Sequence, residues 1–585
     1  MKFVCYTRRA VSEAEYAPRL GLSMHLGYEK NGVFEPLNHN YGVLFVKATQ
    51  DKVSGRIFPK SLKKPFVMPF EGGFKVVAIR CEANGEPDES SKGCAVVFET
   101  PDLVHYNELG LLKLCDEHLD DVMLKVCPNC KSLVAKFSAG GKVYRRKLRS
   151  LTEPTDDVKE IEGGCGCSHK GGHFEYTSTG IEGAYDERTF EVSDEKADYA
   201  LKKLLTPVAV SVEYEKEVEL DRLSDFRVKV NYSDGSHHMK RVDWQEPQNG
   251  FVEGNIHLDH YDFPIAINRA DPCVYRYKGD YYFIATNDAD GNRSIYVRRA
   301  KTIPELVNAP EKLILDAVTY PHVGGLLWAP EFHNVAGKEY IFHACTPKEF
   351  GDEQSHVMAL KEGGELDDRS SWEAPRRVLK KDGTPLYDKG ITLDMTTFES
   401  GGKQYVAWSQ RQFNPIDLGA WVYIATIDKN EPWKLTSDPV LLTIPEYGWQ
   451  NNHTLVDEGP FALIRDGVIY LTFSSALVDS TYCVGMMTAE LGADLLDPKN
   501  WRKGNYPLLH SLVAKGEYGP GHNAYVEDEF GDIWNTYHAR PGIDAPRSSG
   551  IRRVHIGFDG EPVLDLTEDK DLPSSLRSVR VRVKG

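Results

Sequence analysis

The sequence predicts an all-β protein made of several domains. At about 150 residues per domain, its 585 residues correspond to two to four domains. Short β-branched and aromatic stretches bounded by glycine turns, such as 281–286 and 468–473, indicate strands. All nine tryptophans lie at or after Trp244, whereas eight of the 11 cysteines lie before residue 168. We therefore expect a domain boundary near residue 255.

Charge and hydropathy argue against some classes of partner. The chain has 70 basic and 87 acidic residues, a net charge of −17, which disfavours nucleic acid and anionic membranes because both attract positive charge. No apolar run approaches the ~20 residues that span a bilayer. The first 16 residues include Arg8, Arg9, Glu13 and Glu15 and no apolar core, so we expect no secretory signal. With an odd number of cysteines, this predicts a cytoplasmic protein.

Residues 1–192 are expected to form a β-rich region that carries a cysteine cluster. Two close cysteine pairs suit a structural zinc ion, because four thiolates complete its tetrahedral coordination. The candidate ligands are Cys127, Cys130, Cys165 and Cys167, with His169 and His173 as replacements. Free thiols and a redox pair are the alternatives.

Residues 193–255 are expected to form a connector helix and a small β module. Apolar residues recur at helical spacing in 193–205; Ser193 or Asp194 can cap the start, and Pro207 ends the helix. Alternating strands and a Ser233-Asp-Gly235 turn follow. This segment resembles small bacterial immunoglobulin-like modules, which usually act as spacers.

Residues 256–585 contain a repeat of about 60 residues. Each unit opens with an ionisable residue, followed by a short strand, a glycine turn and an aromatic strand. The opening residues, 60, 63, 64 and 64 positions apart, are Asp271, Glu331, Asp394, Glu458 and His522. Five such units predict a five-bladed β-propeller whose first strands line a central channel, gathering these side chains. The alternative is that they only hold water or an ion there.

A degenerate copy of the repeat lies near the N-terminus. Residues 66–79 have the same strand and turn rhythm, but Lys64 and Pro65 stand eight positions before the glycines, where the carboxylate is expected. We expect structure in this copy and no chemistry.

Carboxylates from separate blades suit glycoside hydrolysis, which needs one protonated and one ionised carboxyl group. The ordered motifs are Asn268-Arg-Ala-Asp-Pro272, Trp328-Ala-Pro-Glu331, Thr392-Leu-Asp394, Glu458-Gly-Pro460, Gly519-Pro-Gly-His-Asn523 and Tyr537-His-Ala-Arg540. As a set they resemble glycoside hydrolase family 43 over residues 258–565.

The resemblance implies roles for individual residues. It makes Asp271 the general base that activates water, Glu458 the general acid, and Asp394 the carboxylate that orients the acid. It places Arg540 near the bound sugar, where the arginine could pair with a channel carboxylate. It places His522 beside a channel calcium ion or water, and Trp328 and Glu331 along the same region. No metal is required for the hydrolysis.

Residues 458–475, 481–485 and 495–501 resemble the α-L-arabinofuranosidase branches of the family, so the expected partner is an arabinose-containing oligosaccharide. A β-xylosidase, a retaining fructan hydrolase of a neighbouring family and a non-catalytic carbohydrate-binding propeller are the alternatives. The long N-terminal extension could wall the site, restrict substrate length or form an oligomer contact.

Overall fold

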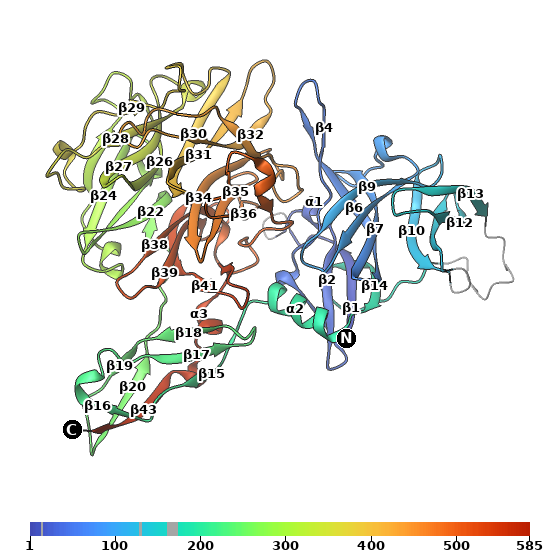
Figure 1. Ribbon diagram of the computed structural model, residues 1–585, viewed down its shortest axis with the longest axis horizontal. Helices are drawn as coiled ribbons and strands as arrows, with labels where there is room; N and C mark the ends of the chain where they lie inside the picture. Colours follow the sequence, from blue (N-terminus) through green and yellow to red (C-terminus); the bar gives the residue numbers. More distant parts are fainter. Residues whose placement is uncertain (13–15, 128–130, 161–173, 585) are drawn as a thin grey trace.

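The computed structural model describes residues 1–12, 16–127, 131–160 and 174–584. Strands dominate this part of the chain, and its α-helices are α1 (Pro18–Gly21), α2 (Asp194–Leu204) and α3 (Glu568–Asp571) (Figure 1). The expectation of an all-β protein is confirmed. Among the described residues, no helix is both long and apolar enough to cross a membrane.

Five four-stranded antiparallel sheets follow one another in the C-terminal half. Sheets 1 to 4 are each built from four consecutive strands, and sheet 5 takes its outer strand from upstream of sheet 1. Sheet 1 contains β22 (Arg269–Tyr277), β23 (Asp280–Asn287), β24 (Ser294–Ala300) and β25 (Lys312–Asp316); sheet 2 contains β26 (Gly325–Val335), β27 (Lys338–Thr346), β28 (Gln354–Ala359) and β29 (Arg376–Arg377). Sheet 3 contains β30 (Gly390–Ser400), β31 (Lys403–Gln412), β32 (Gly419–Thr426) and β33 (Val440–Thr443); sheet 4 contains β34 (Asp457–Arg465), β35 (Val468–Ser475), β36 (Cys483–Glu490) and β37 (Arg502–Lys503). Sheet 5 contains β38 (Tyr518–Glu527), β39 (Ile533–Arg540), β40 (Ser548–Arg553) and β21 (Ala266–Ile267).

The first strands of the five sheets meet in a ring. Each of β22, β26, β30 and β34 contacts the first strand of the next sheet, and β38 returns to β22. The pairing of β21 with β40 joins the start of this half of the chain to its last sheet. The segments that carry the sequence motifs therefore lie side by side.

Each inner strand is interrupted by a β-bulge at the same place. The register shifts there, and one residue takes a left-handed backbone conformation. These residues are Asp271 (φ 51°), Ala329 (φ 45°), Asp394 (φ 53°), Gly459 (φ 54°) and His522 (φ 56°). The counterpart of Asp271 is thus Ala329 in sheet 2 and Gly459 in sheet 4, not Glu331 and Glu458. The sequence repeat was aligned on its ionisable residues, which placed Glu331 and Glu458 at the position of Asp271. The bulge position is set by the strand register, and in sheets 2 and 4 an uncharged residue occupies it.

Side chains of neighbouring sheets bind the bulge N–H groups. Thr286 accepts from Ala329 N at 2.8 Å, and Asp394 accepts from Gly459 N at 3.0 Å. In the same way, Ser474 accepts from His522 N at 2.7 Å, and His538 accepts from Asp271 N at 3.2 Å. Because a bulge leaves an N–H outside the ladder, these bonds satisfy it at four of the five bulges and join four of the five pairs of neighbouring sheets.

The N-terminal region contains three further four-stranded sheets. They are β14 (Ala184–Glu191), β1 (Lys2–Arg8), β2 (His25–Lys30) and β3 (Val33–Pro36); β6 (Lys60–Phe70), β7 (Gly73–Glu82), β8 (Cys94–Thr100) and β9 (Asn107–Lys113); and β10 (Leu119–Val126), β11 (Leu133–Ala139), β12 (Lys142–Leu148) and β13 (Pro154–Glu160). A short hairpin of β4 (Thr49–Gln50) and β5 (Ile57–Phe58) precedes β6. Strand β6 has the same bulge as the C-terminal sheets, with Lys64 at φ 51°.

Helix α2 leads from this region into two small sheets. The first contains β15 (Ala209–Glu213), β17 (Val228–Tyr232) and β18 (His237–Lys240); the second contains β16 (Glu217–Glu219), β43 (Ser578–Lys584), β20 (Phe251–Ile256) and β19 (Val242–Trp244). The last strand of the described chain therefore pairs with β20 and β16. The division of the chain at residues 192 and 255 stays a prediction.

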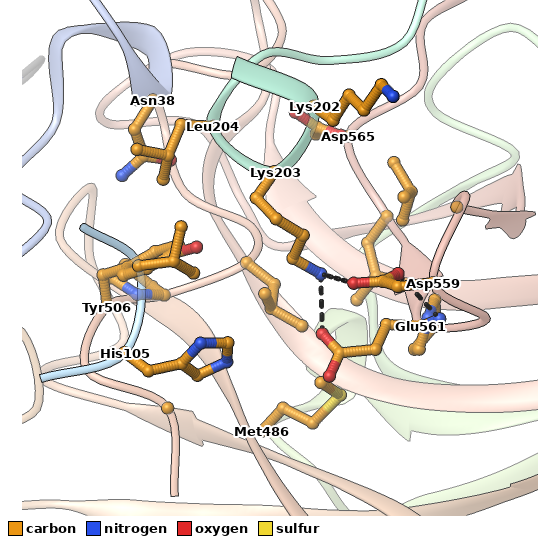
Figure 2. A pocket seen from close by; sticks show the side chains of 18 of the residues that line it. Asn38, His105, Lys202, Lys203, Leu204, Met486, Tyr506, Asp559, Glu561 and Asp565 are labelled. Carbon is orange, nitrogen blue, oxygen red and sulfur yellow. Dashed lines mark hydrogen bonds and ion pairs between the residues drawn. The ribbon is translucent and has the colours of Figure 1, made fainter. Parts of the chain in front are cut away.

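The N-terminal region packs directly on sheets 3 and 4. Tyr16, Leu20, Tyr41 and Phe45 share one apolar cluster with Trp449 in the connection between β33 and β34. Below this contact, α2 borders a cavity of about 110 Å³ together with β42 (Pro562–Val563) and the turn that joins β41 (His555–Ile556) to it (Figure 2). Figure 2 shows Lys203 bridging this cavity to Asp559 at 2.8 Å and Glu561 at 2.7 Å.

A substitution at Gly459 tests whether the bulge of β34 can accommodate a side chain. A Cβ at this position would lie 3.0 Å from Nδ1 of His522, and its φ of 54° also disfavours any side chain. We expect Gly459→Ala to lower the free energy of unfolding by about 1–3 kcal/mol. Gly467→Ala, at φ 79° with open space around its Cβ, is the matched control. Denaturant unfolding should show a larger loss for Gly459→Ala, and equal losses would contradict the tight contact.

Candidate active site

Asp271 is buried at the centre of the ring and is surrounded by positive or polar groups. Its Oδ1 lies 3.2 Å from Nδ1 of His522 and 3.4 Å from Nη1 of Arg547, while Oδ2 accepts a 2.6 Å hydrogen bond from Thr286. Burial alone would raise the pKa of Asp271, but His522, Arg547 and His538 hold that pKa well below its usual value. Asp271 is therefore ionised.

Asp394 and Glu458 form a second group, whose pKa values are shifted in the direction opposite to that of Asp271. Asp394 accepts from Gly459 N, and Glu458 Oε1 accepts a 2.8 Å hydrogen bond from the Tyr482 hydroxyl. Burial raises the pKa of Asp394 to about 8; the charges of Glu458 and Asp271 act in the same direction, and His522 opposes them. Burial also raises the pKa of Glu458, against the effect of Tyr482. The two carboxyls titrate as a pair, which keeps a proton at neutral pH.

His522 stands between the two groups. Although burial alone would lower it, the charges of Asp271, Asp394 and Glu458 raise the pKa of His522. Its Nε2 is buried and has no partner among the described residues. Such an atom fits one water or one metal bond, but no trio of ligating side chains in the described part of the chain includes His522. The calcium ion or water expected beside His522 stays a prediction.

Trp328 and Glu331 lie on β26 beside this centre. Glu331 is buried and pairs with His333 at 2.6 Å. Trp328 is half-buried, and its ring lies 5.8 Å from Phe350, which is in turn 5.6 Å from Phe413. Phe350 is 42% exposed. These three rings form a partly exposed aromatic row in which neighbouring ring planes are tilted by 60° and 59°.

Arg540 does not make the carboxylate contact suggested for it. Its guanidinium donates to the backbone carbonyls of Ala545 at 2.7 Å and Val478 at 3.1 Å. The arginine beside Asp271 is Arg547, which also grips Asp288 with bonds of 2.9 and 2.8 Å. Sequence reasoning missed Arg547 because it lies in the connection between β39 and β40, outside every motif that carried the resemblance.

Glu353 was also missed. It is fully buried, and neither carboxyl oxygen has a partner among the described residues. Burial, and then the charge of Asp394, hold the pKa of Glu353 well above its usual value, so it is a neutral acid beside the site. No sequence signal distinguishes it from the other acidic residues of the chain.

The cysteine cluster lies mostly outside the described residues. Cys127 follows β10 and is half-buried, whereas Cys130, Cys165 and Cys167 fall outside the described part of the chain. The zinc site stays a prediction.

The chain is similar to curated arabinofuranosidases. An extracellular exo-α-(1→5)-L-arabinofuranosidase of Streptomyces chartreusis is 35% identical over 283 residues, which cover 48% of this chain and 82% of that protein. A protein of the same name from Streptomyces avermitilis is 32% identical over 311 residues, covering 51% of this chain and 62% of that protein. A crystal structure of an α-L-arabinofuranosidase from Lactobacillus brevis, 31% identical, has a TM-score of 0.46 and covers 52% of this chain and 96% of that one.

These comparisons correct one expectation and establish the family. Both Streptomyces relatives are named extracellular, which contradicts the cytoplasmic location inferred from the N-terminal residues and the odd cysteine count. The N-terminal sequence was the wrong basis for that inference. The family model for glycosyl hydrolases family 43 matches residues 261–562, just over half of the chain and the segment that forms sheets 1 to 5. The chain therefore belongs to glycosyl hydrolases family 43.

Proposed function

We propose that this protein is an α-L-arabinofuranosidase that removes terminal α-L-arabinofuranosyl residues from arabino-oligosaccharides with inversion. The observation that carries the proposal is that the pKa values of three carboxyl groups around one centre are shifted in opposite directions. The pKa of Asp271 is held down, whereas the pKa values of Asp394 and Glu458 are raised. Environments that push titratable groups apart in this way assign the base and the acid.

The reaction follows from these protonation states. The ionised Asp271 takes a proton from a water molecule, whose oxygen attacks the anomeric carbon from the face opposite the leaving group. Glu458 gives its proton to the glycosidic oxygen as the carbon–oxygen bond breaks. Asp394 orients Glu458 and shares its proton. The sugar leaves with inverted configuration, and no metal ion takes part.

The scaffold that we propose for this chemistry is a five-bladed propeller. The ring of inner strands and the pairing of β21 with β40 support it, since a propeller places the first strand of every blade around one axis. The two small sheets that follow α2 support an immunoglobulin-like spacer. A calcium ion or water beside His522 and a zinc ion at the cysteine cluster stay proposals without a part in the reaction.

The names of the relatives favour arabinose over xylose as the sugar. The aromatic row of Trp328, Phe350 and Phe413 supports a carbohydrate that extends beyond one ring, because aromatic faces stack on sugars. A β-xylosidase and a non-catalytic binding propeller are the outcomes against which the proposal is tested.

Replacing the two proposed catalytic groups tests the assignment. We expect Asp271→Asn and Glu458→Gln each to reduce kcat by about 10²- to 10⁴-fold on an α-L-arabino-oligosaccharide, because each removes one proton transfer. Asp466→Asn, in the exposed turn at the far end of β34, is the control and should keep full activity. Hydrolysis of para-nitrophenyl α-L-arabinofuranoside and β-D-xylopyranoside, with and without chelator, identifies the sugar. Preference for the xyloside would overturn the substrate assignment, and unchanged activity in both variants would overturn the mechanism.

Arg547 tests the electrostatics of the base. Its positive charge lowers the pKa of Asp271, so Arg547→Ala should raise that pKa. Because the base acts when ionised, the acidic limb of the kcat/KM profile should move to higher pH. Arg547→Lys keeps the charge and should move it less. An acidic limb that stays in place in Arg547→Ala would show that another group controls it.

A further inference from the structure

Arg19, in helix α1 of the N-terminal region, reaches into the C-terminal half of the chain. Its Nη1 donates to the backbone carbonyl of Asn451 at 2.7 Å, and Nη2 donates to the side-chain oxygen of the same residue. The planar guanidinium thus grips one residue with two bonds, which fixes its orientation as well as its position. Asn451 lies in the connection between β33 and β34, and its own amide donates to the carbonyl of Pro445 at 3.0 Å.

Among the residues that the structure describes, Asn451 is the hydrogen-bond partner of the Arg19 side chain. Burial lowers the pKa of Arg19 to about 10, and no ion pair joins it to a carboxylate of the described residues. Its Nε has no partner among them either. Arg19 is half-buried, and both of its described side-chain hydrogen bonds go to Asn451.

The connection gripped by Arg19 is bonded to the loop between β35 and β36. Ala476 N donates to the carbonyl of Gln450, and Leu477 N donates to the carbonyl of Asn452, both at 3.2 Å. Nδ1 of His453 lies 2.8 Å from Oδ2 of Asp479. Three contacts therefore join residues 450–453 to residues 476–479.

This loop leads directly to the proposed general acid. The carbonyl of Asp479 accepts a 3.3 Å hydrogen bond from Tyr482 N, and the Tyr482 hydroxyl donates to Glu458 at 2.8 Å. The other side of the acid is tied to the same connection, because the Gln450 amide donates to both carboxyl oxygens of Asp457, the residue before Glu458.

We propose that Arg19 is a positioning residue for Glu458, so that the N-terminal region completes the site formed by sheets 1 to 5. This inference rests on the proposed function, in which Glu458 protonates the leaving oxygen. Arg19 lies outside the segment matched by the family model, so the contact is a property of this chain's extension. Loss of the grip lets residues 450–453 and Tyr482 shift and places the acid less well against the glycosidic oxygen.

The test compares substrates that depend differently on the acid. A para-nitrophenolate leaves with little protonation, whereas a sugar hydroxyl must be protonated as it leaves. We expect Arg19→Ala to reduce kcat on arabinobiose about tenfold more than on para-nitrophenyl α-L-arabinofuranoside, a part of the effect of a lost general acid. Arg19→Lys keeps the positive charge but loses the two parallel guanidinium donors, so its loss of kcat should lie between those of the wild type and Arg19→Ala. Arg56→Ala, at an exposed arginine of the same region, should change neither rate.

Two further variants keep the proposal falsifiable if Arg19→Ala folds poorly. Asn451→Ala removes the side-chain acceptor, and Tyr482→Phe removes the hydroxyl that contacts Glu458. Both should show the same selective loss on arabinobiose. The double variant Arg19→Ala/Tyr482→Phe should lose little more than Tyr482→Phe, because both changes act through one contact. Thermal unfolding of every variant verifies that it is folded.

Equal losses on the two substrates, or no loss on either, would overturn the role of Arg19 and leave the proposed function intact. If the wild type cleaves xylosides instead, the same comparison is made with xylobiose and para-nitrophenyl β-D-xylopyranoside. Absence of hydrolysis on every glycoside would overturn the proposed function and the role of Arg19 together.

Discussion

The β-bulge in each inner strand is the constraint on which the site depends. A bulge turns one residue out of the pleat and leaves its N–H without a ladder partner. At four of the five bulges that N–H is bound by Thr286, Asp394, Ser474 or His538 of a neighbouring sheet. The same bonds therefore hold the sheets in a ring and bring the side chains of Asp271, Asp394 and His522 together. Asp394 takes part in both the scaffold and the carboxyl pair, so the geometry of the site cannot vary independently of the fold.

Electrostatics then separates carboxyls that share this space. Asp271 and Asp394 are buried and Glu458 is half-buried, and burial alone would raise the pKa of each. Asp271 differs because His522 and Arg547 face it, and Arg547 is itself oriented by Asp288. At Asp394 and Glu458 burial has the larger effect, and the hydrogen bonds from Gly459 N and Tyr482 only partly oppose it, so their pKa values stay raised. The N-terminal region adds a structural contact to this arrangement, since Arg19 donates hydrogen bonds to Asn451 in the connection that leads into β34, the strand that carries Glu458.

Much of this arrangement could be predicted from the sequence. The aromatic strands and glycine turns indicated the β-units, and the spacing of their opening residues placed Asp271, Asp394 and His522 at one centre. The second repeat unit was misaligned by two residues and the fourth by one residue. The residues at their bulges, Ala329 and Gly459, carry no charge that would mark the position in the sequence. Arg547 and Arg19 could not be found, since each acts through contacts with residues far away in the chain, and no sequence signal marks the buried Glu353. The location was inferred from the N-terminal residues, which say little about a folded enzyme.

The stereochemistry of the first-formed product tests the central claim most directly. Proton NMR can follow the anomeric signals of an α-L-arabinofuranoside during the first minutes of hydrolysis, before the sugar equilibrates. If Asp271 activates a water molecule that attacks opposite the leaving group, β-L-arabinofuranose appears first. Initial release of the α-anomer would show that a carboxylate attacks the sugar itself, and would contradict the account of a base and an acid tuned in opposite directions.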